Sequence, residues 1–137
     1  MNPLGLEVGQ RARRSKTVTA RDVELYAEIT EDRNPLHFDP EFAARTRFGR
    51  LVAQGGITSG MLNALVAMDL PGPGTVFMSQ SLRYLAPTYL GDRLTAEVEV
   101  LVVKPDKPVC QLKATITNQD GAVVLEGECW TYTLQLK

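Results

Sequence analysis

Between residues 31 and 43 the sequence reads EDRNPLHFDPEFA and brings together residue types that can move protons. His37 is the only histidine of the chain, and Asp32 lies five residues before it. An imidazole titrates near neutral pH, and a neighbouring carboxyl group can share in general acid and base catalysis. Asn34 and Pro35, between the two, indicate a stiff turn. Asp32 and His37 are therefore candidates for proton transfer.

Each of these residues also has an ordinary structural interpretation. His37 could be a loop histidine bonded to the backbone, and Asp32 could accept a hydrogen bond from the backbone two positions further on. Asn34 belongs to the same class of turn formers. Spacing alone therefore leaves the function open.

A second group of residues lies at the start of an apolar segment. Gly55 and Gly56 precede Ile57 to Asp69, which predicts a buried helix because apolar side chains occupy nearly all of its faces. The first turn of a helix has unpaired backbone N–H groups at the positive end of the dipole. They could stabilise an oxyanion or a polarised thioester carbonyl, or the glycines could simply turn the chain. Ser59 and Asn63 share one helical face, as a core pair or as part of a polar site.

Shorter elements precede the apolar helix. An extended stretch is predicted near Gln10 to Val18. Thr19 and Asp22 have the spacing of a capping box and predict a helix that ends by Asn34, because a proline follows. Asp39-Pro40 predicts the N-cap and first residue of a short helix.

The second half of the chain is rich in strand-like segments. Between Leu94 and Val102, apolar residues alternate with polar ones, which is typical of a sheet with one buried face. At 137 residues the chain has the length of one domain, so we expect a single domain over residues 1–137. The order of elements predicts the α+β class, with an antiparallel sheet around one helix. The predicted strands are Thr75 to Ala86, Arg93 to Lys104, Pro108 to Asn118 and Ala122 to Leu134.

Composition excludes several classes of function. The chain has 15 lysines and arginines against 16 aspartates and glutamates. It therefore lacks the excess of positive charge that would indicate nucleic acid as a partner. There is no basic and apolar leader and no apolar run long enough for a bilayer, so we expect no membrane partner and a cytoplasmic location. Cys110 and Cys129 lack metal-ligand spacing and are expected to be free.

The residues Tyr26, Asp32-Arg33-Asn34-Pro35-Leu36-His37 and Ala43 resemble the motif of the MaoC-like (R)-specific enoyl-CoA hydratases. The resemblance extends over nearly the whole chain and is greatest to the short members associated with polyhydroxyalkanoate synthesis. It implies a hot-dog fold, in which a curved antiparallel sheet wraps a central helix. It also implies (R)-specific hydration of trans-2-enoyl-CoA without a metal or other cofactor, in a homodimer.

Carried over by position, the resemblance implies that Asp32 and His37 are catalytic and that the N–H of Gly55 meets the thioester carbonyl. Asn34 matches the motif asparagine, and Gly56 and Asn63 complete the expected substrate-binding set.

The sequence departs from the family at Glu31, where glycine is common, and at Gln54, where histidine is common. A third departure is Gly56, which replaces a bulkier apolar residue and could widen the acyl pocket or loosen the helix start. Arg33, Arg45, Arg47 and Arg83 are candidates for contact with the phosphates of CoA. Arginines are more often solvated or paired with acidic side chains, so these four are left out of the expected site.

Three other functions fit the same residues. A hot-dog thioesterase would hydrolyse the thioester and release a thiol. A non-catalytic acyl-binding subunit of a heteromeric hydratase would bind enoyl-CoA without turnover. A dehydratase could act on substrates bound to an acyl carrier protein.

Overall fold

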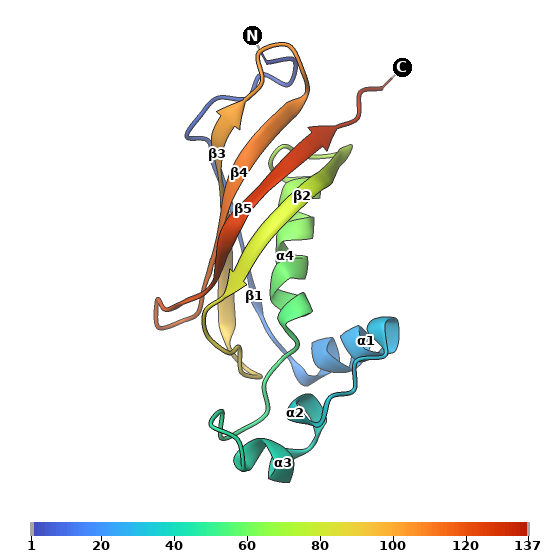
Figure 1. Ribbon diagram of the computed structural model, residues 1–137, viewed down its shortest axis with the longest axis vertical. Coiled ribbons are helices and arrows are strands. Elements are labelled where there is room, and N and C mark those ends of the chain that lie inside the picture. The colour runs from blue at the N-terminus through green and yellow to red at the C-terminus, as the bar shows by residue number, and fades with distance from the viewer. Residues whose placement is uncertain (1, 137) are drawn as a thin grey trace.

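A computed structural model describes residues 2–136 and contains five strands and four helices in that range (Figure 1). Helical elements are concentrated in the first half of the chain and strands in the second, as predicted. In chain order the elements are β1 (Arg11–Thr17), α1 (Ala20–Thr30), α2 (Pro35–Phe38), α3 (Pro40–Ala44), α4 (Gly55–Met68), β2 (Thr75–Tyr84), β3 (Arg93–Val103), β4 (Val109–Thr117) and β5 (Val123–Thr133).

All five strands form one antiparallel sheet in the order β1-β3-β4-β5-β2. The sheet is curved, and α4 lies against one of its faces (Figure 1). The side chains of Leu112, Ile116 and Leu125 are fully buried in the core. The α+β class and a curved antiparallel sheet around one long helix are therefore confirmed.

The predicted alternation in β3 holds only as far as Val100. Leu94, Val98 and Val100 are fully buried, but Val102 is 37% exposed. A bulge between Val100 and Val102 interrupts the pairing of β3 with β4. One extra residue exchanges the two faces of a strand, so the prediction that Val102 faces the core was wrong.

Helix α4 begins at Gly55, two residues earlier than predicted, so both glycines belong to its first turn. Leu62, Leu65 and Val66 are buried against the sheet. The helix is not buried on all sides, however, because Asn63 and Met68 are exposed. A single sheet covers only one side of a helix, so the prediction of a buried helix holds for the side that faces the sheet.

Three short helices cluster at one end of the sheet, beside the N-terminal end of α4 (Figure 1). The capping box of Thr19 and Asp22 opens α1, and Asp39 caps α3 with Pro40 at its first position, both as predicted. We expected a plain turn around residue 36, but Pro35–Phe38 is a one-turn helix. This end of the molecule contains the candidate catalytic residues.

Candidate active site

His37 is held by a hydrogen bond to the main chain. Its Nδ1–H donates to the carbonyl oxygen of Val52 over 2.7 Å, and the side chain is almost completely buried. A carbonyl can only accept, so Nδ1 must carry the hydrogen. In the neutral imidazole, Nε2 is then the nitrogen with a free lone pair. The ring is therefore fixed both in orientation and in tautomer.

Asp32 faces the free nitrogen of that ring. Its Oδ2 lies 3.9 Å from His37 Nε2, and its side chain is 42% exposed while that of the histidine is 9% exposed. This distance is too long for a direct hydrogen bond. The other carboxylate oxygen, Oδ1, accepts from the N–H of Asn34 over 3.2 Å. The turn role and the proposed site role of Asp32 thus use different oxygens.

The local sequence explains why these two side chains converge. Helix α1 ends at Thr30, and its C-cap Glu31 has a left-handed backbone with φ of 66° and donates its N–H to the carbonyl of Ala27. Asn34 then caps α2 by accepting from the N–H of Leu36 over 3.1 Å. Two consecutive side-chain turns reverse the chain between the aspartate and the histidine.

Val52 connects the histidine to the start of α4. Its N–H donates to the carbonyl of Leu36 over 3.1 Å, while its own carbonyl accepts from His37. Gly55 follows three residues later, and three residues span at most about 11 Å. The candidate histidine and the helix start are therefore joined by one short segment.

The start of α4 has backbone donors without a side-chain cap. Gln54 occupies the N-cap position but makes no capping hydrogen bond. Its buried side chain instead donates through Nε2 to the carbonyl of Val23 over 3.1 Å, which joins α1 to α4. Gly55 is exposed, and its N–H group lies in the first turn at the positive end of the helix, where backbone N–H groups have no partner within the helix.

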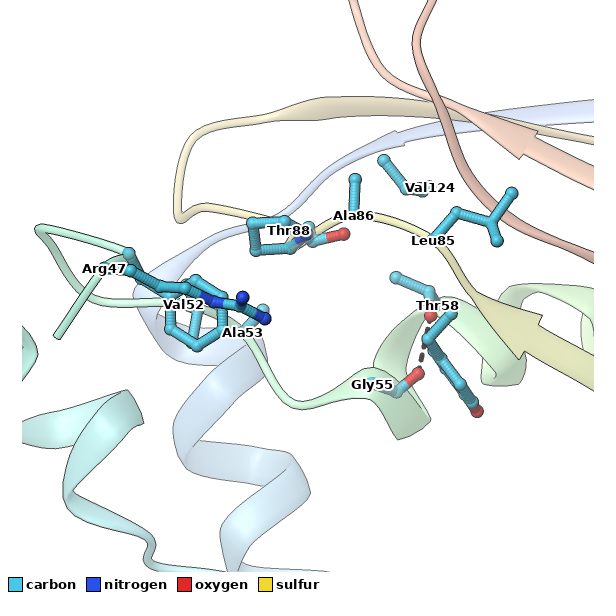
Figure 2. A pocket seen from close by; sticks show the side chains of 12 residues that line it. Arg47, Val52, Ala53, Gly55, Thr58, Leu85, Ala86, Thr88 and Val124 are labelled. Carbon is cyan, nitrogen blue, oxygen red and sulfur yellow. Dashed lines mark hydrogen bonds between the residues drawn. The ribbon is translucent and has the colours of Figure 1, made fainter.

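A cavity of about 300 Å³ opens beside this helix start (Figure 2). Gly55, Thr58, Leu85 and Val124 line it, and Arg47 lines it as well. The hydroxyl of Thr58 donates to the carbonyl of Gly55 over 2.6 Å, drawn as a dashed line in Figure 2. Neither Asp32 nor His37 lines this cavity. The cavity instead approaches the candidate pair through Val52, which lines it and accepts the hydrogen bond of His37.

The other expected binding residues lie in different surroundings. The side-chain oxygen of Asn34 is engaged in capping α2. A Cβ atom at Gly56 would lie 1.6 Å from the hydroxyl of Tyr26, so the tyrosine fills the space that the missing side chain leaves. Asn63 is exposed on the outer face of α4 and does not line the cavity. Their binding roles remain predictions.

Sequence reasoning missed the contributions of Val52 and Tyr26 to this site. The Val52 contact uses a backbone carbonyl, which has no side-chain signature. Tyr26 was recognised as part of the motif, and its contact with Gly56 needs the approach of α1 to α4.

Within residues 2–136, no group of three or more histidine, cysteine, aspartate or glutamate side chains could hold a metal ion. In the same residues, no helix has both the length and the apolar character needed to cross a membrane.

Comparison with known proteins identifies the family. The model of the MaoC like domain matches residues 5–122. The (R)-specific enoyl-CoA hydratase of Aeromonas caviae is 43% identical over 128 residues, which cover 93% of this chain and 96% of that protein. The 3-hydroxybutyryl-CoA dehydratase of Methylorubrum extorquens is 43% identical over 123 residues, covering 90% of this chain and 78% of that protein.

Solved structures agree with the sequence comparison. The (R)-hydratase of A. caviae involved in PHA biosynthesis superposes with a TM-score of 0.91 at 42% identity, covering 95% of this chain and 98% of that one. An unliganded R-hydratase of Pseudomonas aeruginosa gives a TM-score of 0.88 at 37% identity, covering 96% of this chain and 88% of that one. These likenesses confirm the hot-dog fold. Because sequence and fold agree over nearly its whole length, the chain belongs to the MaoC-like family.

Proposed function

We propose that this protein adds water reversibly to trans-2-enoyl-CoA and forms (R)-3-hydroxyacyl-CoA. The observation that carries the proposal is the fixed geometry of His37, whose Nε2 faces the carboxylate of Asp32 while Nδ1 is held by Val52. The relatives from A. caviae and M. extorquens are named as an (R)-specific hydratase and a 3-hydroxybutyryl-CoA dehydratase, which are the two directions of one reaction type.

The start of α4 binds the thioester in this proposal. The N–H of Gly55 donates to the thioester carbonyl and stabilises the negative charge that develops there as C3 is attacked. An interaction that strengthens as charge develops lowers the barrier and does not merely tighten substrate binding. Removal of one such donor in other enzymes costs about 3 kcal/mol of this stabilisation.

Asp32 and His37 activate the water. Their facing atoms are 3.9 Å apart, a separation that one water molecule can bridge with a hydrogen bond to each. One proton of the water passes to this pair as the oxygen adds to C3, and the pair returns a proton to C2. The sum is addition of one water across the double bond. Because Nδ1 is committed to Val52, Nε2 is the nitrogen that exchanges the proton.

The direct test is to incubate the purified protein with crotonyl-CoA and follow both the enoyl absorbance and the release of thiol. We expect the absorbance to fall without thiol release, and chiral analysis to identify the (R)-3-hydroxy product. Equal release of thiol would identify a thioesterase. Binding of crotonyl-CoA without turnover would identify a non-catalytic subunit, and either result would refute the proposal.

We propose further that two copies of the chain associate through β2. Both β1 and β2 are edge strands, but they differ in character. The β1 edge carries charged side chains in ion pairs, including Arg11 with Glu99 and Lys16 with Asp22. The β2 edge exposes three apolar side chains, which are Val76, Met78 and Tyr84, beside a single ion pair of Arg83 with Glu126. Charged side chains discourage pairing at a sheet edge, whereas an exposed apolar edge invites it.

Sedimentation tests this dimer. We expect the wild type to sediment as a dimer and Met78→Lys to shift it toward the monomer, because the ammonium group would be buried at the new interface. Lys113→Met, an exposed position on the central strand β4, serves as the control. A wild type that stays monomeric at micromolar concentration would contradict the interface.

The proposal also places the enzyme in the cytoplasm. Cys110 and Cys129 are free and buried, although they lie on the adjacent strands β4 and β5. Free thiols are typical of reducing compartments.

A further inference from the structure

The arginines of this protein fall into two groups when their ion pairs are compared. Of the four candidates for phosphate contact, Arg33 donates to Glu24 over 3.0 Å and Arg83 to Glu126 over 2.7 Å. Each pairing raises the pKa of the arginine through its hydrogen bond to the carboxylate. In residues 2–136, neither Arg45 nor Arg47 makes an ion pair. Arg45 and Arg47 are therefore better candidates than Arg33 and Arg83 for binding an external anion.

Residues 45–50, the arginine loop, carry a local positive charge. The loop contains Arg45, Arg47 and Arg50, all exposed, and no acidic residue. Arg50 also makes no ion pair within the described part of the chain, and its guanidinium stacks on the ring of Tyr89 at 4.0 Å. A segment of this charge stands out in a chain whose formal net charge is −1.

Internal hydrogen bonds fix the shape of the arginine loop. The hydroxyl of Thr46 donates to the carbonyl of Ala43 over 2.7 Å and accepts from the N–H of Phe48 over 3.2 Å. The hydroxyl of Tyr89 donates to the carbonyl of Phe48 over 3.0 Å. These bonds hold the backbone on both sides of Arg47 before a ligand arrives, which lowers the entropy cost of ordering the loop on binding.

Arg47 and Gly55 line the same cavity (Figure 2). The guanidinium carbon of Arg47 lies 5.7 Å from the centroid of the Phe48 ring, and in Figure 2 the guanidinium extends toward Ala53. The cavity is thus lined both by an exposed cation and by Gly55 at the start of α4. The rest of the lining is mostly apolar and includes Val52, Ala53 and the 84–88 segment.

We propose that this cavity holds the pantetheine arm of the substrate and that Arg47, with Arg45 and Arg50 beside it, binds the phosphate end of that arm. The inference rests on the proposed function, because the carbonyl of the thioester must meet Gly55. A thioester carrier has a neutral arm with phosphate at its far end, which matches a mostly apolar cavity with an exposed guanidinium in its lining. Arginine suits phosphate because its planar fork donates two hydrogen bonds at once.

An apolar acyl tail fits this cavity less well. A tail that filled the cavity would contact Arg47 and cover part of its guanidinium without a counter-charge, which is unfavourable. The exposed position of Arg47 instead suits a carrier that remains partly in solvent. We therefore assign the cavity to the carrier arm, and occupation by the acyl chain becomes an outcome of the test.

The test compares thioesters that differ only in their phosphates. In Arg47→Ala, we expect KM for crotonyl-CoA to rise about tenfold with kcat nearly unchanged, because a charge-assisted contact to an exposed phosphate is lost. KM for crotonyl-pantetheine, which has the same arm without phosphate, should not change. Arg47→Lys should recover part of the loss. Arg21→Ala removes an exposed arginine that makes no ion pair in residues 2–136 and does not line the cavity, and it should change neither KM.

Crotonyl-phosphopantetheine distinguishes the two sources of phosphate. A tenfold effect with this compound assigns the contact to the phosphate that CoA shares with carrier proteins. An effect confined to crotonyl-CoA assigns it to the nucleotide phosphates. Both results support the inference. An unchanged KM for crotonyl-CoA in Arg47→Ala, or an equal rise for crotonyl-pantetheine, would overturn it and return the cavity to the acyl chain.

Calorimetric binding of free CoA separates this inference from the proposed reaction. We expect Arg47→Ala to weaken the Kd of CoA about tenfold and Arg21→Ala to leave it unchanged. If the wild type hydrated neither thioester but bound CoA through Arg47, the phosphate site would stand and the proposed function would fail. If it hydrated both thioesters and Arg47→Ala bound CoA normally, only the phosphate site would fail.

Discussion

Alanine substitutions at Gly56 and Gly60 provide a sensitive test of how α1 packs on α4. Both glycines lie in α4, but a Cβ atom at Gly60 would meet nothing within 4 Å, while one at Gly56 would lie 1.6 Å from the hydroxyl of Tyr26. In a helix, alanine is more stable than glycine by roughly 0.5–1 kcal/mol. Gly60→Ala should therefore stabilise the protein by about that amount.

Gly56→Ala gains the same helix propensity, but its methyl group also clashes with Tyr26. Ordinary contacts of a Cβ atom begin at 3.4 Å, so the ring of Tyr26 would have to move by about 2 Å. Overpacking of this kind costs roughly 1–3 kcal/mol. Because the helical gain is similar in both variants, the difference between them measures the clash. Chemical denaturation at one fixed protein concentration should place Gly56→Ala about 1–3 kcal/mol below Gly60→Ala, or about 4 °C in Tm per kcal/mol.

Repeating both alanine substitutions in the Tyr26→Leu variant shows whether Tyr26 causes the difference in stability. Leucine at position 26 is too short to reach Gly56, so Gly56→Ala should lose most of its cost in Tyr26→Leu. Equal stabilisation by Gly56→Ala and Gly60→Ala in the wild-type background would refute the packing of Tyr26 on the helix start.

Three further predictions concern stability and reactivity. Glu31→Gly should stabilise the protein by about 1 kcal/mol in denaturation experiments, because Glu31 has a φ of 66° that favours glycine; a loss of stability would contradict the left-handed backbone. The pKa of Asp22 is raised by burial but lowered more by the N–H of Thr19 and by Lys16, and the net shift is downward. A lowered pKa contributes stability above the unfolded pKa near 3.9, so Asp22→Ala should cost about 1 kcal/mol at pH 7 and progressively less below pH 4, and a constant difference would argue against the ionised cap. Burial, with a smaller effect from Cys110, raises the pKa of Cys129 to about 12, and burial also raises that of Cys110; a thiol reagent at pH 8 should label neither until the protein unfolds, and rapid labelling of the native protein would contradict their burial.

Local signals in the sequence were sufficient for several elements. The capping box of Thr19 and Asp22 and the Asp39-Pro40 start of α3 depend only on residues within one turn, and both predictions were confirmed. The departure at Glu31 also has a structural meaning, since this position adopts a backbone that glycine prefers.

Features that depend on distant pairing could not be predicted in this way. The outward side chain of Val102 results from a bulge opposite β4, and nothing within β3 announces it. The bond from His37 to the carbonyl of Val52 spans 15 residues and uses an acceptor that every residue carries. The exposure of Asn63 follows from how far one sheet can wrap α4.

The rates of hydration of crotonyl-CoA by Asp32→Asn and His37→Ala test the central claim most directly. Asp39→Asn is a matched control, because this nearby carboxylate only caps α3. We predict that each of the first two variants keeps its fold by circular dichroism and loses at least about a hundredfold in kcat, while the control keeps most of its activity. Near wild-type kcat in both Asp32→Asn and His37→Ala would contradict the assignment of the facing carboxylate and imidazole as the acid–base pair.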